Sequence, residues 1–101
     1  METNEIIGKL TEKGGKLWEK GSMKRIYFNA SAWGLEVNHY NTGNISSATI
    51  NGERISNSEA ARCENVKIWY DLQDGKFYTK NMDSLHNDAR IAIEKFITNA
   101  L

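Results

Sequence analysis

The sequence predicts an α+β fold: an antiparallel sheet of about five or six strands, with a C-terminal helix packed on one face and short N-terminal and middle helices. Two hairpin signals support this prediction, because Asn51-Gly52 and Asp74-Gly75 each lie between runs that alternate apolar and polar residues. The third observation is an apolar stripe at helical spacing within residues 83–101.

Length and composition limit the possibilities. The 101 residues, 40% of them apolar and 26% charged, suit a single globular domain over residues 1–101. A formal net charge of zero argues against a strongly basic nucleic-acid binder and against an acidic mimic of nucleic acid. The single Cys63 allows no internal disulfide, and neither a secretory signal nor a long apolar run is present, so we expect a cytoplasmic protein without membrane segments.

The first third of the chain contains a predicted helix and a predicted hairpin. Residues 4–13 form the helix, which ends at Gly14-Gly15. Its apolar side chains lie on one side: Ile6, Ile7 and Leu10. Residues 16–29 follow as two strands around the turn Lys20-Gly21-Ser22, and residues 30–35 as a single helical turn or loop.

The middle of the chain predicts further strands that lead into a short helix. Residues 36–50 hold two strands, and Asn51-Gly52 then forms a type I′ turn, since both residues tolerate positive φ. Ser56 and Glu59 have the spacing of a capping box, in which the Ser56 hydroxyl accepts from the Glu59 amide and the Glu59 side chain reaches back. This spacing predicts a helix over residues 57–64.

The second strong hairpin, residues 65–80, turns at Asp74-Gly75. Pairing outward from a two-residue turn places Leu72 opposite Phe77 and Trp69 opposite Lys80. One face then holds Val66, Ile68, Tyr70, Leu72 and Phe77. The opposite face holds Lys67, Trp69, Asp71, Tyr78 and Lys80.

Residues 83–101 form the clearest predicted helix, capped by Asp83 or Ser84. Its apolar stripe needs a sheet face to cover, and the apolar face of the second hairpin is the natural partner. The stripe contains Leu85, Ala89, Ala92, Ile93, Phe96, Ile97 and Ala100. Ile91 lies off the stripe among polar residues, which leaves room for a homodimer formed through this helix or for a single exposed Ile.

No pattern in the chain points to catalysis, to a metal or to a cofactor. His39, His86 and Cys63 are isolated and have none of the paired spacings of metal ligands. Cys63 has Ala neighbours on a short helix, as expected of a small core residue, and the serines fit strands, caps and turns. We therefore expect a protein that is not an enzyme and that carries no metal and no cofactor.

The unusual feature is the polar face of the second hairpin, where Trp69 and Tyr78 lie with Lys67 and Lys80. Aromatic rings flanked by lysines on a sheet can stack on the bases of single-stranded nucleic acid while the lysines meet phosphates. Trp and Tyr are also the commonest anchors of protein interfaces. A third interpretation is that a second layer, such as the N-terminal helix, covers this face and makes it core.

A second candidate patch is the basic run from Lys9 to Arg25. Its six cations outnumber its two carboxylates, which gives a local formal charge of +4, and Trp18 and Tyr27 are interleaved. Such interleaving is typical of a nucleic-acid surface, and a solvated hairpin with scattered lysines is the alternative. The residues of this run that we predict to bind a partner are Trp18, Lys20 and Arg25.

Three segments, taken together, resemble a group of small uncharacterised proteins of bacterial phages and mobile elements. They are KLWEKGSMKRIYFN, YNTGNISSATINGERISNSEAAR and YDLQDGKFY, which fall within residues 15–80. Small stand-alone phage proteins often bind host machinery, anti-CRISPR and other anti-defence inhibitors among them. The resemblance therefore implies that context, and it brings no catalytic residues.

The leading expectation is a non-enzymatic binding protein, encoded by a phage, that blocks or modulates a bacterial protein or ribonucleoprotein complex in the host cytoplasm. The residues expected to make the contact are Trp69, Tyr78, Lys67, Lys80, Trp18, Lys20 and Arg25. The alternative is a nucleic-acid-binding module that uses the same residues, whose binding would weaken steeply as salt rises. An enzyme acting on a small ligand is a third possibility, which would need an apolar pocket with converging polar groups.

Overall fold

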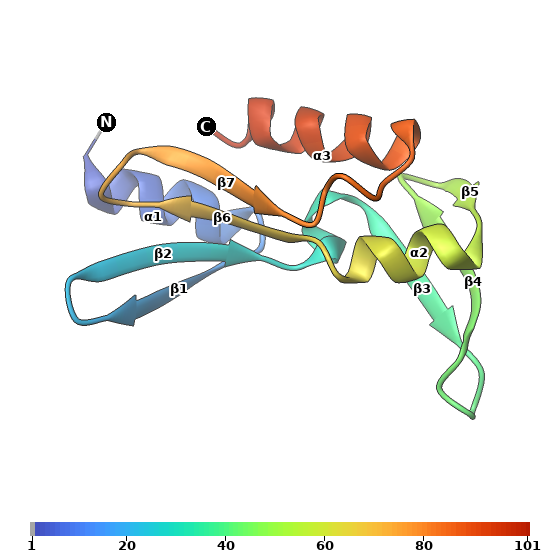
Figure 1. The fold of residues 1–101 in the computed structure, drawn as a ribbon. Coiled ribbons are helices and arrows are strands. Elements are labelled where there is room, and N and C mark those ends of the chain that lie inside the picture. The colour runs from blue at the N-terminus through green and yellow to red at the C-terminus, as the bar shows by residue number, and fades with distance from the viewer. Residues whose placement is uncertain (1) are drawn as a thin grey trace.

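The computed structural model describes residues 2–101, which form an elongated molecule of 41 × 26 × 23 Å (Figure 1). The helices and strands predicted from the sequence are present, and the α+β class is confirmed. In chain order the elements are α1 (Thr3–Glu12), β1 (Gly15–Lys20), β2 (Met23–Phe28), the 3₁₀ helix η1 (Ala30–Trp33), β3 (Leu35–His39), β4 (Ile45–Ile50), β5 (Glu53–Ile55), α2 (Asn57–Glu64), β6 (Lys67–Asp71), β7 (Lys76–Lys80) and α3 (Asn87–Asn99).

The described strands number seven and form two antiparallel sheets, where the sequence predicts about five or six strands in one sheet. Four strands pair in the order β1-β2-β6-β7, and three pair in the order β3-β4-β5. After β2 the chain leaves the first sheet through η1, which ends at Gly34. Gly34 has a φ of +100°, a left-handed value that favours glycine. The segment from η1 to α2 is thus an insertion between β2 and β6, which pair directly.

The hydrophobic core fills the space between the four-stranded sheet and the helices α1 and α3, and it continues to η1, the three-stranded sheet and α2 through Trp33, Leu35, Ile50 and Cys63. Leu10 of α1 is fully buried in the same cluster as Ile26 and Phe28, and Phe96 of α3 meets Phe28 edge-on with ring centroids 5.1 Å apart. The predicted stripe of α3 faces this core as expected. Figure 1 shows α3 lying above β6 and β7 and extending toward the three-stranded sheet.

The second hairpin has the predicted faces but a different register. Trp69 lies opposite Tyr78 and Lys67 lies opposite Lys80, so the predicted pairing of Trp69 with Lys80 is wrong. Each partner has moved by two positions. Because side chains alternate with a period of two, this shift leaves every residue on its predicted face.

The register differs because the turn is a four-residue loop over residues 72–75 and not a two-residue turn. The Asp71 carboxylate accepts from the amides of Gln73 and Asp74, at 2.8 and 3.0 Å, and the Gly75 amide donates to the Asp71 carbonyl at 2.9 Å. Gly75 has a φ of +70°. The Asp71 side chain therefore stabilises the longer loop, a use of Asp that the Asp-Gly pair alone does not reveal.

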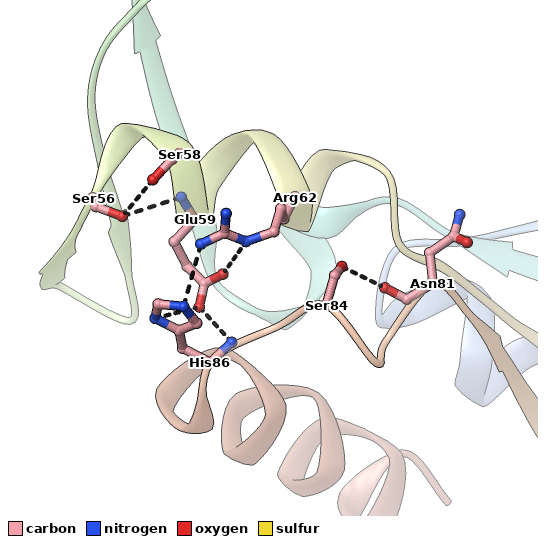
Figure 2. Close-up of polar contacts among 7 residues, drawn as sticks. All are labelled: Ser56, Ser58, Glu59, Arg62, Asn81, Ser84 and His86. Atoms are coloured by element: carbon pink, nitrogen blue, oxygen red, sulfur yellow. Dashed lines mark hydrogen bonds and ion pairs between the residues drawn. The ribbon is translucent and has the colours of Figure 1, made fainter.

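Half of the predicted capping box is present. The Ser56 hydroxyl accepts from the Glu59 amide at 3.1 Å, but the Glu59 carboxylate points toward α3 (Figure 2). It accepts from the His86 amide at 2.6 Å and from Nε of Arg62 at 3.2 Å. Because this carboxylate accepts from the amide just before the last helix, α3 begins at Asn87. The predicted caps, Asp83 and Ser84, lie before the helix start and do not cap it.

Gly15 lies at a close approach of α1 to β1, and we expect Gly15→Ala to destabilise the protein. A Cβ there would meet the Ile26 side chain, the Leu10 carbonyl oxygen at 2.8 Å and the Phe28 ring at 2.9 Å. Overpacking of this kind should lower the free energy of unfolding, measured in urea, by about 2 kcal/mol. Gly8→Ala is the matched control, because Gly8 is exposed within α1 with open space around it, and this variant should gain about 0.5–1 kcal/mol. A neutral Gly15→Ala variant would contradict the described packing of α1.

Candidate functional site: the open face of the four-stranded sheet

One face of the four-stranded sheet is turned away from the core, and we call it the open face. The strand register fixes its members, because residues opposite one another on neighbouring strands share a face. Each strand contributes three side chains: Lys16, Trp18 and Lys20 from β1; Met23, Arg25 and Tyr27 from β2; Lys67, Trp69 and Asp71 from β6; and Lys76, Tyr78 and Lys80 from β7.

The two patches predicted separately from the sequence lie on this one face. The residues concerned are Trp69, Tyr78, Lys67, Lys80, Trp18, Lys20 and Arg25. They meet because β2 pairs with β6, which places Tyr27 opposite Trp69 and joins the first hairpin to the second. The basic run is divided by the fold, since Lys9 lies on α1 and Lys24 belongs to the other face of β2.

Four aromatic rings, one from each strand, form a continuous row across the open face, which we call the aromatic row. Trp18 meets Tyr27 edge-on with ring centroids 6.0 Å apart, and Tyr27 and Trp69 are 5.8 Å apart. Trp69 and Tyr78 are nearly parallel at 5.8 Å. The outer rings of Trp18 and Tyr78 are 37% and 38% exposed, whereas Tyr27 and Trp69 are half-buried between them.

Arg25 is built into the aromatic row. Its guanidinium carbon lies 5.8 Å from the Trp18 ring centroid and 5.3 Å from that of Trp69, and its Nη1 donates to the Tyr27 hydroxyl at 3.0 Å. Within residues 2–101, Nε of Arg25 is buried and has no hydrogen-bond acceptor. Cation–π contacts on two indoles fix this side chain, so the row combines rings with one positioned cation.

Positive charge is concentrated on the open face. It carries six cations and the single carboxylate of Asp71, a formal charge of +5. Because the whole chain is formally neutral, the remaining residues together carry −5. Two further carboxylates, Asp74 and Glu64, lie at the margin of the face. The neutral total therefore hides a strongly polarised distribution.

The N-terminal helix does not cover the open face, so the interpretation of a second layer formed by α1 is wrong. α1 packs on the opposite face, where Leu10 is buried with Ile26. The reason is Gly15, whose missing side chain lets the end of α1 approach the apolar side of β1 and β2. Lys67 and Lys80 are accordingly exposed.

The Tyr78 hydroxyl is held by the turn of its own hairpin. It donates a hydrogen bond to the carboxylate of Asp74, and this bond raises the pKa of Tyr78 above its usual value of 10. The hydroxyl is thus held by the turn, while the ring lies nearly parallel to that of Trp69. This geometry orients the ring at the edge of the aromatic row.

A hollow of about 490 Å³ lies at one end of the open face, where the chain leaves β2 and enters β6. Trp69 and Tyr27 line it on the ring side, and Lys67 and Lys80 supply cations. Its wall is shallow and mixed in polarity, and Glu64 is a further lining residue. The hollow thus extends the open face beside Trp69.

Five side chains of the open face were not among the residues predicted to bind a partner: Lys16, Met23, Tyr27, Asp71 and Lys76. Alternation along β7 places Lys76 on the same face as Tyr78 and Lys80, so the strand pattern was sufficient to find it. Lys16 and Met23 lie on the predicted first hairpin, where alternation from Trp18 and Arg25 places them on the same face. Local patterns carry no signal only for the pairing of β2 with β6, which joins this hairpin to the second one.

Cys63 is fully buried, and burial raises the pKa of its thiol to about 11, which keeps it protonated and unreactive. No group of three or more His, Cys, Asp and Glu side chains gathers as metal ligands do within residues 2–101. None of the helices in this range is long and apolar enough to span a bilayer.

The homodimer through α3 stays a prediction. Ile91 is 50% exposed and Leu101 is 47% exposed, as the off-stripe position of Ile91 indicated. Both side chains are separate from the open face, so a dimer of this kind would leave the aromatic row accessible.

In comparisons with protein-family models, with curated proteins and with solved structures, no match to this chain was found.

Proposed function

We propose that this chain is a non-enzymatic binding protein that docks through its open face on a bacterial protein or ribonucleoprotein complex and blocks or modulates it. A phage or mobile element is the proposed source, in line with the resemblance of the strand segments. The observation that carries the proposal is the aromatic row surrounded by cations on a sheet face that the helices leave uncovered.

The composition of the face supports binding over a purely structural role. Aromatic rings with large contact areas and few rotatable bonds are the usual anchors of interfaces. A face needed only for folding would gain nothing from six cations grouped at a formal charge of +5 in a neutral chain. This concentration of positive charge attracts an acidic partner surface and repels a basic one.

The proposal predicts that removing the rings abolishes capture of a partner without unfolding the chain. In a pull-down from bacterial lysate, the double variant Trp69→Ala with Tyr78→Ala should retain none of the proteins or nucleic acids captured specifically by the unaltered chain. Tyr40→Ala is the matched control, because Tyr40 is 62% exposed at the tip of the β3–β4 hairpin, outside the open face. It should capture normally.

Circular dichroism and thermal melting establish whether each variant is folded. Loss of capture by Tyr40→Ala alone would move the site to the β3–β4 hairpin. If the double variant unfolds, Tyr78→Leu replaces it, since Tyr78 lies on an edge strand and is exposed. Unchanged capture by a folded variant without these rings would contradict the proposal.

A further inference from the structure

The aromatic row has the properties of a stacking platform. It is uninterrupted, with one ring from each of the four strands and neighbouring centroids 5.8–6.0 Å apart. An interface built for one protein usually relies on a few anchors that cluster near its centre in well-packed, desolvated pockets. A row of rings instead suits a chain of planar groups, and every nucleobase has a π-face that can stack.

The type of cation points in the same direction. Five of the six cations on the open face are lysines. Lysine is depleted in protein–protein interfaces relative to the rest of the surface, whereas lysines and arginines that neutralise phosphates dominate binding to nucleic acid. The one carboxylate within the face, that of Asp71, is occupied by two amides of the turn.

We infer that the open face binds single-stranded nucleic acid, with bases stacked along the aromatic row and phosphates held by the surrounding lysines. This inference rests on the proposed function and names the chemistry of the contact: an exposed single strand in a bacterial ribonucleoprotein complex. A duplex does not fit, because its bases are stacked inside and a four-stranded face is too broad to enter a groove that admits a helix or a two-stranded ribbon.

The hollow lies beside the middle of the row, next to Tyr27 and Trp69, and offers the nucleic acid a further position there. Its lining includes Trp69 for stacking and Arg25, Lys67 and Lys80 for a phosphate. The most exposed rings, Trp18 and Tyr78, lie at the two ends of the row. A single-stranded nucleic acid that runs along the row, across the β-strands, therefore meets a ring or a cation at each step.

The test is a titration of the purified chain with a single-stranded oligonucleotide of about ten nucleotides, followed by tryptophan fluorescence. The indoles of Trp18 and Trp69 report on the face, while Trp33 is buried. We expect quenching, with an affinity that falls with salt by a logarithmic slope of about −0.7 for each phosphate contacted. The duplex of the same sequence should bind at least about tenfold more weakly.

Two pairs of variants separate stacking from charge. Lys67→Gln with Lys80→Gln should make the salt slope shallower by about 1.4, which corresponds to two lost phosphate contacts. Lys9→Gln with Lys95→Gln should leave the slope unchanged, because these exposed residues lie on α1 and α3. Tyr78→Leu should weaken binding by about tenfold through lost stacking, and Tyr40→Leu should not.

Absence of binding at low salt, a flat salt dependence, or equal binding of single strand and duplex would each overturn the inference. The proposed function is judged separately by the pull-down with nuclease added. If partners are still captured after nuclease treatment, and are lost with Trp69→Ala and Tyr78→Ala, the open face binds a protein and only the inference fails. If the folded variant with Trp69→Ala and Tyr78→Ala captures partners as well as the unaltered chain does, both the inference and the proposed function fail.

Discussion

Reversing two charges on the open face, with Lys67→Glu and Lys80→Glu together, should abolish capture of the partner. These lysines lie opposite one another on β6 and β7, both exposed, beside the paired rings of Trp69 and Tyr78. The substitution leaves four cations against three carboxylates on the face, so its formal charge falls from +5 to +1. For a polyanionic partner we expect a loss of at least about a hundredfold in affinity, since two attractive contacts are replaced by repulsion.

The matched control for this variant is Lys9→Glu with Lys95→Glu, which changes the net charge by the same amount away from the open face. Measured side by side by titration at low salt, the control should bind within a few-fold of the unaltered chain. If both double variants lose affinity equally, the net charge of the molecule decides binding and the open face has no special role. If neither loses affinity, the partner is not acidic.

Much of this fold could be predicted because its signals are local. The type I′ turn is an example: Asn51 and Gly52 have φ angles of +51° and +85°, as the Asn-Gly pair indicates. The division into two sheets could not be predicted, because it depends on β6 returning to pair with β2 across the inserted segment. Hydrophobic alternation shows which face of a strand is buried but not which strand lies beside it.

The candidate site shows the same limit. Alternation along the second hairpin placed Trp69 and Tyr78 on one face correctly even though the register was wrong, since the error was an even number of residues. The charge of the face could not be predicted from the neutral total, which is the sum of a basic sheet face and an acidic remainder. Net charge excludes a class of partner only when the charges are evenly spread over the surface, and here they are not.

Glu59 was predicted to belong to a cap, whereas its position in the structure gives it a larger role. Its carboxylate connects α2 to the start of α3 (Figure 2). Only about 5% of the side chain is exposed. It accepts from the His86 amide and from Arg62, whose Nη2 is also 3.3 Å from Nε2 of His86. Removing this one acceptor leaves the first amide before α3 without its partner.

We therefore expect Glu59→Ala to lower the free energy of unfolding by about 3 kcal/mol, which is in the range for breaking a buried charged pair by removing one member. Glu59→Gln keeps an oxygen that can accept from the His86 amide, so it should lose less. Glu64→Ala is the control, because Glu64 is exposed at the end of the same helix. Urea denaturation measures all three variants.

Hydrogen exchange distinguishes the proposed cause from a general loss of stability. In Glu59→Ala, the amides at the start of α3 should lose protection more than those of β2 and β6, since the carboxylate acts at that junction. Equal loss throughout would mean that Glu59 stabilises the fold only through burial of α2. If Glu59→Ala were as stable as Glu64→Ala, the contact with the His86 amide would contribute nothing, and the late start of α3 would need another cause.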